Sequence, residues 1–328
     1  MKKLFIALFL IFTTGACIYA QSLFQLQFPV KCQIDKDCWI INYVDDDPTV
    51  NWHDYKNGRE TYEGHTGTDI AIKNISQMKQ GVDVLAAESG FVVATRDEVP
   101  DKNALSQDLN QLQNIGCGNR VAIKHSGNFI TDYCHMKKGS IKVKKGDFVL
   151  AGQKLGQIGM SGLTEFPHLH INVQKNNQFI DPFTGLERYT KGVSAPLWSA
   201  PVLKQLAYKP VVVYNVGVSN EIPTLLNIRN EKYKSNQVGA DSNMIIVWVD
   251  MFHVEANDSV DILVKSPSGA TFIKEHIAID KSNAKRFAFV GKKKPLTGFT
   301  KGNYKAQISF SRQKANLNAL KSFNFTVN

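Results

Sequence analysis

Between residues 68 and 175 the chain repeats short segments in which apolar and polar side chains alternate, with glycine-containing turns between them. Alternation with a period of two puts successive side chains on opposite faces of a strand, so this pattern predicts an antiparallel β-sheet. The polar stretch Asp97–Asn114 interrupts the pattern, and we expect a helical insertion there, near the rim of a groove. The predicted strands are Thr68–Ile72, Val84–Ala87, Gly90–Thr95, Arg120–Lys124, Ile130–Tyr133, Phe148–Leu150, Lys154–Ile158 and His168–Val173.

A second series of apolar segments begins near residue 211, again separated by turns such as Ser266–Gly269. Six or seven short strands at this spacing predict an immunoglobulin-like β-sandwich. The chain as a whole is therefore expected to be all-β, with an antiparallel β-sheet domain followed by the sandwich. The predicted strands are Val211–Val218, Met244–Phe252, Ser259–Lys265, Thr271–Ile277, Arg286–Val290 and Tyr304–Ser311.

These patterns divide the chain into five parts: a signal peptide at 1–20, an N-terminal extension at 21–60, the first β domain at 61–186, a linker at 187–209 and the sandwich at 210–328. We expect the extension to wrap the first domain rather than to fold alone. Because the linker contains three prolines, a chain ending near residue 190 is expected to fold and to work independently.

The first twenty residues have the composition of an export signal. Lys2 and Lys3 precede the apolar run Leu4–Phe12, which is too short to span a bilayer, and Ile18–Ala20 offers a cleavage site. An alternative is a lipoprotein anchored through Cys17, and secretion is another. We expect an exported, periplasmic protein with no transmembrane helix.

Two separated motifs carry candidate chemistry: His65 with Asp69, and His168 with His170. In a strand, residues two apart face the same side, so both histidines of the second motif would project into one groove. Two imidazoles with one carboxylate form a set that catalytic zinc accepts while keeping a position open for water. The glycines at 64 and 67 favour a turn, rather than a helix, before the strand that begins at Thr68.

These motifs, together with Tyr133–Met136 and the stretch Gly159–Gly162, resemble the lysostaphin-type zinc metallopeptidase family over roughly residues 60–185. The family has a duplicated hybrid motif fold and cleaves peptide cross-links of bacterial peptidoglycan. The resemblance implies one zinc ion per chain, with His65, Asp69 and His170 as metal ligands. It implies that His135 and His168 are the catalytic histidines, sharing proton transfer and stabilisation of the oxyanion. One departure from the family is the pair Glu165–Phe166, where many relatives have smaller residues.

The remaining histidines are expected to be surface or satisfied core residues, as lone histidines usually are. His125 is the one among them that closes a predicted strand near the expected site. This ordinary interpretation applies to His53, His125, His253 and His276.

Removal of Cys17 with the signal leaves four cysteines, an even number that is typical of an exported protein with disulfides. Three pairings are possible. We favour Cys32 with Cys38, which closes a short loop, and Cys117 with Cys134, which flank a predicted hairpin. A site with four cysteine ligands to zinc is the alternative, but the spacing lacks a CxxC pair.

The net charge of +10 favours anionic envelope polymers and would also attract nucleic acid. The basic residues are spread along the chain and no nucleic-acid motif is present, so we expect no nucleic-acid partner. Three functions compete: a zinc-dependent endopeptidase acting on peptidoglycan peptides, a non-catalytic envelope protein that binds or activates cell-wall hydrolases, and an adhesin or structural envelope protein that uses mainly the C-terminal sandwich. Because all five family residues are present, the endopeptidase is expected. The C-terminal domain offers a surface for an envelope protein partner.

Overall fold

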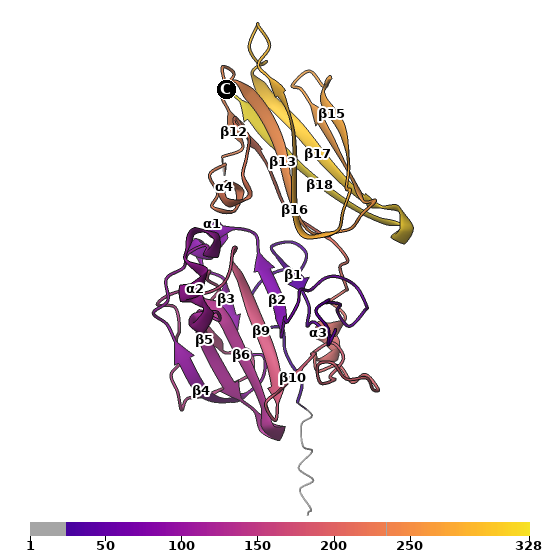
Figure 1. The fold of residues 1–328 in the computed structure, drawn as a ribbon. Helices are drawn as coiled ribbons and strands as arrows, with labels where there is room; N and C mark the ends of the chain where they lie inside the picture. The colour runs from indigo at the N-terminus through magenta and orange to yellow at the C-terminus, as the bar shows by residue number, and fades with distance from the viewer. Residues whose placement is uncertain (1–23, 234) are drawn as a thin grey trace, which may run out of the picture.

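The computed structural model describes residues 24–233 and 235–328, so the predicted signal peptide and Cys17 lie outside the described residues. It contains two β-rich bodies, one above the other in Figure 1: an N-terminal domain, residues 24–209, and a C-terminal domain, residues 211–328. The prediction of a mainly antiparallel all-β chain is confirmed, because the strand pairs of the described residues are antiparallel except β12 with β18. In the part of the chain described, no helix is both long and apolar enough to cross a membrane.

One large sheet dominates the N-terminal domain, in the order β1-β2-β9-β6-β5-β4-β7, with β10 pairing on β9. A separate pair, β3 with β8, lies beside it. The strand β1 was not predicted; it adds the N-terminal extension to the edge of the sheet. The strands are β1 (Cys38–Asn42), β2 (Thr68–Ile72), β3 (Asp83–Leu85), β4 (Gly90–Arg96), β5 (Asn119–Lys124), β6 (Phe129–Met136), β7 (Phe148–Val149), β8 (Lys154–Gln157), β9 (His168–Lys175) and β10 (Gln178–Ile180).

Helical structure in this domain is short. The predicted insertion contains the 3-10 turns Ala104–Ser106 and Gln113–Ile115 around α2 (Leu109–Leu112). Two further helices are α1 (Ile75–Gln80), which Asn74 caps through its side chain, and α3 (Ala200–Leu203), which has a proline in its first turn. The remaining 3-10 turn, Ser126–Asn128, connects β5 to β6.

The core of the N-terminal domain includes residues from both flanking segments. Leu26 and Val30 of the extension are buried in it, and so are Trp198, Val202 and Leu206 from the segment predicted to be a linker. Trp198 is one of the largest fully buried side chains of the described residues. A chain ending near residue 190 would therefore lose part of this core, which argues against the expectation that it folds independently.

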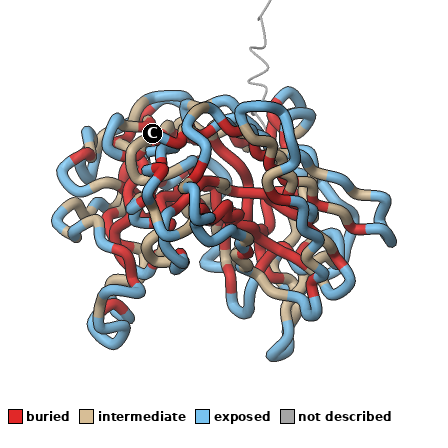
Figure 2. Tube along the Cα trace, turned by 90° about the horizontal axis from the view of Figure 1, so that it is seen from above, coloured by how far each residue is buried: buried red, intermediate tan, exposed pale blue. Residues whose placement is uncertain are grey.

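Two sheets packed face to face form the C-terminal domain: β11-β13-β16 and β12-β18-β17-β14-β15. Figure 2 shows buried stretches in the interior of the molecule and exposed loops around them. This arrangement is a β-sandwich; its immunoglobulin-like character stays a prediction. The elements are β11 (Val212–Ser219), α4 (Leu225–Arg229), β12 (Gln237–Val238), β13 (Met244–Val254), β14 (Ser259–Lys265), β15 (Thr271–Ala278), β16 (Asn283–Lys293), β17 (Gly302–Arg312), a 3-10 turn (Gln313–Ala315) and β18 (Leu317–Val327).

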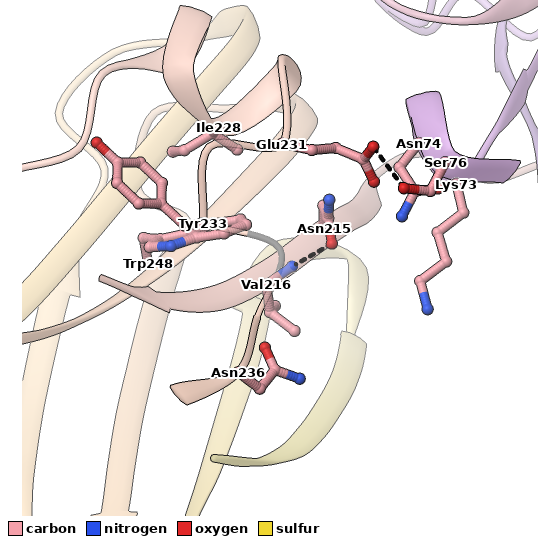
Figure 3. A pocket seen from close by; sticks show the side chains of 10 residues that line it. All are labelled: Lys73, Asn74, Ser76, Asn215, Val216, Ile228, Glu231, Tyr233, Asn236 and Trp248. Carbon is pink, nitrogen blue, oxygen red and sulfur yellow. Dashed lines mark hydrogen bonds between the residues drawn. The ribbon is translucent and has the colours of Figure 1, made fainter. Parts of the chain in front are cut away.

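The two domains share a buried apolar cluster. From the N-terminal domain it takes Trp39, Ile41, Ala71 and Phe166, and from the C-terminal domain Val212, Tyr214 and Phe252. The Tyr214 hydroxyl also donates a 2.6 Å hydrogen bond to the carbonyl of Ile72. A polar cavity of about 300 Å³ lies along the same boundary (Figure 3), where Ser76 donates to the Glu231 carboxylate at 2.7 Å. The domains are thus joined by both apolar packing and buried polar contacts.

Both favoured disulfides are present, Cys32–Cys38 and Cys117–Cys134, so the predicted pairing is confirmed. The second bridge joins the segment before β5 to the end of β6. By the loop-entropy argument, a bridge closing a loop of this length contributes about 3 kcal/mol.

Candidate metal centre and cleft

The candidate site lies on three adjacent strands, β2, β9 and β6 (Figure 1). Asp69 on β2 stands directly opposite His170 on β9 in the antiparallel register. His168 lies two residues earlier on β9, while Leu169 between them is fully buried in the core. The prediction that the HxH motif lies on a strand, with its leucine facing the core, is therefore confirmed.

His65 reaches the site from the turn before β2. Its Nδ1 lies 2.6 Å from the carbonyl oxygen of Tyr43. A carbonyl can only accept, so Nδ1 carries the proton and Nε2 faces the other site residues. The turn itself is held by Asp45, whose buried carboxylate accepts from the Gly64 backbone N–H at 3.0 Å. Gly67 is required nearby, because a Cβ there would lie 2.5 Å from the carbonyl oxygen of Ile171.

Three potential ligand atoms converge in this site. The Nε2 atom of His65 lies 3.1 Å from Asp69 Oδ1 and 3.1 Å from His170 Nδ1, and the last two atoms are 2.9 Å apart. Ligand atoms bound to a tetrahedral zinc at 2.0–2.1 Å lie about 3.3 Å from one another. The residues present therefore fit a small divalent cation, in donor chemistry and in spacing.

Two other groups of residues within the described chain have metal-ligand spacing, but each contains a disulfide. They are Cys32, Asp37 and Cys38, and Cys117, Asp132 and Cys134. Because oxidised cysteines are not thiolate ligands, the His65–Asp69–His170 cluster is the one suited to a metal among the described residues. The proposal of a four-cysteine zinc site is wrong for the same reason.

His135 occupies an unusual backbone conformation at the end of β6. Its φ of 59° lies in the left-handed region, which a non-glycine residue adopts at a cost. Two backbone hydrogen bonds hold it there, from its own N–H to the Cys117 carbonyl at 2.8 Å and from Gly159 N–H to its carbonyl at 3.0 Å. The disulfide of Cys134 anchors the preceding residue. The fold therefore fixes this histidine in a strained conformation beside the cluster.

The side chains of His135 and His168 are each held by a hydrogen bond from Nδ1 to a backbone carbonyl. His135 Nδ1 lies 2.8 Å from the carbonyl oxygen of Ser161, and His168 Nδ1 lies 3.0 Å from that of Phe166. Both Nδ1 atoms must donate, which leaves each Nε2 as the free nitrogen. The two rings are neighbours, with centroids 4.6 Å apart, and His168 Nε2 lies 3.5 Å from Asp69 Oδ1. Two oriented imidazoles thus lie beside the ligand cluster.

Burial sets the charge balance of the site. Burial alone would raise the pKa of Asp69, but the charges of His65 and His168 outweigh it and hold this pKa well below its usual value. Burial, with repulsion from His168 and His170, lowers the pKa of His135 well below that of a free histidine. Burial also lowers the pKa of His170, against the opposing effect of its hydrogen bond to the Asp69 carboxylate. An ionised Asp69 and a neutral His170 are the forms that ligate a metal.

A cleft of about 390 Å³ opens beside the cluster, and both domains line it. Asp69, His135 and His168 form its floor, and Leu105 and Leu109 of the predicted insertion lie at its rim, half exposed. The expectation of an insertion near the groove is confirmed. On the other side, the cleft is bounded by residues of the C-terminal domain: Phe252, Ala284 and Lys285.

The loop residues that depart from the family make contacts to the C-terminal domain. Glu165 pairs with Arg229 at 3.1 Å and with Lys285 at 2.6 Å. The buried ring of Phe166 packs against Phe252, with ring centroids 5.2 Å apart. The large side chains of Glu165 and Phe166 therefore pack the two domains together at the edge of the cleft. The sequence alone did not reveal this role.

The other histidines lie away from the ligand cluster. His125 is buried and satisfied, with Nδ1 2.9 Å from the Ser89 carbonyl and Nε2 2.8 Å from the Thr131 hydroxyl. His53 and His276 pair with aspartates near the surface. His253 is buried at the domain boundary. The ordinary interpretation agrees with the contacts of His53, His125 and His276, whereas His253 contacts the N-terminal domain through its Nε2.

Asn42 is a site residue that the sequence analysis missed. Its side-chain amide donates a 2.6 Å hydrogen bond to Asp69 Oδ2, and it lines the cleft. It lies 27 residues before Asp69, and the pairing of β1 with β2 brings the two together. Without knowledge of β1, no sequence signal singles it out.

The N-terminal domain is similar to known peptidases. The model of peptidase family M23 matches residues 63–182. Peptidoglycan DD-endopeptidase ShyC of Vibrio cholerae is 29% identical over 154 residues, which cover 42% of this chain and 33% of the relative. Peptidoglycan DD-endopeptidase ShyA of the same organism is 35% identical over 109 residues, covering 33% of this chain and 20% of the relative. The chain thus spans a third or less of the length of these two relatives.

A solved structure, the catalytic domain of lysostaphin from Staphylococcus simulans, is 26% identical and covers 43% of this chain and 85% of that chain, with a TM-score of 0.27. Lysostaphin of Staphylococcus staphylolyticus is 37% identical over 79 residues, which cover 23% of this chain and 16% of that protein. Residues 63–182 are a domain of peptidase family M23, the lysostaphin-type family, and the predicted family is confirmed.

Proposed function

We propose that this protein is a zinc-dependent endopeptidase that hydrolyses peptide cross-links of bacterial peptidoglycan after export to the periplasm. The observation that carries the proposal is the convergence of His65 Nε2, Asp69 Oδ1 and His170 Nδ1 within 3.1 Å of one another, beside two oriented histidines in one cleft. The M23 family match supports the reaction class, and the DD-endopeptidase names of the Vibrio cholerae relatives support the substrate class.

In this proposal His65, Asp69 and His170 hold the ion. When bound, zinc lowers the pKa of a water to about 7 and polarises the scissile carbonyl. The protein's own groups orient that chemistry: Tyr43 fixes the tautomer of His65 through its carbonyl, and Asn42 fixes the second oxygen of Asp69.

His135 and His168 are the proposed catalytic residues. Their Nδ1 atoms donate to backbone carbonyls, so a free Nε2 in the cleft can accept a proton from the attacking water. The imidazolium formed in this way can donate that proton to the leaving amine, while the other ring stabilises the oxyanion of the tetrahedral intermediate.

The test is digestion of purified sacculi by the wild-type protein, with mass spectrometry of the released muropeptides. We expect cleaved cross-links, near-stoichiometric zinc, loss of activity with a chelator and recovery on adding zinc. His170→Ala should lose both the zinc and the activity. The matched control is His276→Ala, which removes an exposed histidine of the C-terminal domain and should behave like wild type. Hydrolysis by protein free of metal would contradict the proposal.

A further inference from the structure

A buried hydrogen-bond path runs from the C-terminal domain to the candidate metal centre. It begins at His253 on β13, which is only 3% exposed. Its Nε2 lies 2.5 Å from the carbonyl oxygen of Ile41 and 3.1 Å from Asn42 Oδ1. The Asn42 amide in turn donates to Asp69 Oδ2 at 2.6 Å. Two hydrogen bonds therefore separate a side chain of one domain from a proposed metal ligand of the other.

Each bond in the path fixes the direction of the next. Because the Ile41 carbonyl only accepts, His253 Nε2 carries a proton, and the neighbouring oxygen of Asn42 accepts from it as well. This orientation of the amide leaves the Asn42 NH₂ group to face Asp69. With Oδ2 engaged by that donor, Oδ1 is the carboxylate oxygen that meets His65 and His170. The tautomer of His253 thus determines how the carboxylate is presented.

The backbone has an unusual conformation on both sides of the contact between Ile41 and His253. In β1 the register shifts between Ile40 and Asn42, and such a bulge leaves the extra residue, Ile41, out of the regular ladder. On the other side, His253 has a φ of 58°, which is costly for a non-glycine residue. Arg312 holds that conformation by donating to the His253 carbonyl at 2.8 Å.

Arg312 is itself anchored, so the contact is rigid. Its guanidinium meets both oxygens of the buried Asp258 at 2.9 Å. A side chain that merely filled space at the boundary would need neither this support nor a donor aimed at Asn42. The strained backbone of His253, the bulge at Ile41 and the hydrogen bonds through Asn42 are independent observations, and all three support the same role for His253.

We propose that His253 is a positioning residue for the metal centre: through Asn42 it orients the Asp69 carboxylate, so that docking of the C-terminal domain completes the site. The inference rests on the proposed metal site. Groups that orient metal ligands typically affect metal affinity by 10- to 100-fold when they are removed. The C-terminal domain is therefore part of the metal centre's architecture as well as one wall of the cleft.

The test measures zinc affinity of the full chain by competition with a chromogenic chelator. His253→Phe keeps a ring but removes the donor, and we expect zinc binding to weaken by about 10-fold or more. His253→Gln restores an N–H donor and should recover most of the affinity. His276→Ala, an exposed histidine in the same domain, should leave the affinity unchanged.

A second variant tests the path from the other side. Asn42→Leu removes the middle of the path without changing the C-terminal domain, and we expect the same loss of affinity as for His253→Phe. The double variant should lose no more than either single one, because both remove the same interaction.

The outcomes separate this inference from the proposed function. Wild-type affinity in a folded His253→Phe protein, equal losses in the Phe and Gln variants, or fully additive losses in the double variant would each overturn the positioning role alone. Failure of the wild-type chain to bind zinc would overturn the proposed function, and the inference with it.

Discussion

In the described part of the chain, two of the buried polar clusters are built in opposite ways. In the candidate metal centre, Asp69 Oδ1 lies within 3.1 Å of His65 Nε2 and His170 Nδ1, and the proton of His65 lies on its other ring nitrogen. In the cluster at the domain boundary, the guanidinium of Arg229 meets both oxygens of Asp250, at 3.1 and 3.2 Å, and one oxygen of Glu165 at 3.1 Å.

The difference lies in the balance of donors and acceptors. Arg229 supplies donors to every carboxylate oxygen it contacts, so its cluster is satisfied by protein groups alone. The metal centre brings together three groups whose metal-ligating forms are acceptors, which favours an added cation. A buried cluster rich in acceptors therefore indicates a ligand site, whereas a cluster with matched donors indicates structure.

Replacing an aspartate by asparagine in each cluster tests this comparison, and the larger effect is expected in the candidate metal centre. Asp69→Asn keeps the shape of the side chain but removes its charge, and we expect zinc affinity to fall by more than about 100-fold, beyond the usual effect of an orienting residue. Zinc should then no longer raise the melting temperature as it does for the wild type. Chelator competition and calorimetry measure both effects. Zinc-dependent stabilisation of Asp69→Asn equal to that of wild type would refute the assignment.

The two neighbouring histidines should separate catalysis from binding. His135→Ala and His168→Ala each remove a proposed proton-transfer group and no metal ligand. We expect turnover to fall by roughly 10²- to 10⁴-fold while zinc remains bound. Metal analysis beside kinetics on a soluble cross-linked peptide decides this. Loss of zinc from His168→Ala would mean that the roles of the two histidines on β9 are exchanged.

At the domain boundary, we expect the same kind of substitution to lower the free energy of unfolding rather than the zinc affinity. Asp250→Asn leaves Arg229 buried with a poorer partner, and breaking a buried pair costs about 3–5 kcal/mol of unfolding free energy. The matched control is Asp261→Asn in the exposed pair with His276, which should cost about 1 kcal/mol or less. Urea unfolding measures the stability of both variants. Equal losses of unfolding free energy would show that the buried Arg229 cluster stabilises the protein no more than the exposed pair does.

The sequence brought together the residues of the candidate metal centre better than their surroundings, for a physical reason. The motif residues lie on or beside β2 and β9, and strand periodicity already places Leu169 in the core and its neighbours in the groove. The family resemblance supplied His135. Neither source predicts which distant segments meet, so Asn42 and the second wall of the cleft were missed.

The linker illustrates the same limit. Its prolines predicted a linker that the first domain does not need for folding, yet Trp198 packs into the core and α3 lies just after it. Proline restricts only the local backbone, while burial depends on which apolar side chains the folded domain accepts. The large residues Glu165 and Phe166 were visible as departures from the family, but their partners Arg229 and Phe252 lie in a segment that the resemblance does not cover.

The smallest expected effect is the pH dependence of stability that His253 causes at the boundary between the domains. Burial lowers the pKa of His253 to about 4. In the unfolded chain this histidine would titrate near 6.5, so between pH 6.5 and 4 the unfolded state binds more protons than the folded one. Its contribution to stability is therefore complete above pH 6.5 and declines as the pH falls toward 4, by an amount on the order of 3 kcal/mol.

His253→Phe removes this proton linkage, so the difference in unfolding free energy between wild type and the variant should shrink as the pH is lowered through this window. Urea unfolding of metal-free protein at several pH values between 7 and 4.5 measures it, because the titration of the metal ligands is then common to both proteins. His276→Ala, whose histidine is exposed, should follow the wild-type profile. Parallel profiles for wild type and His253→Phe would mean that His253 does not stay neutral at the boundary, and that the contact with Asn42 tolerates a charged ring.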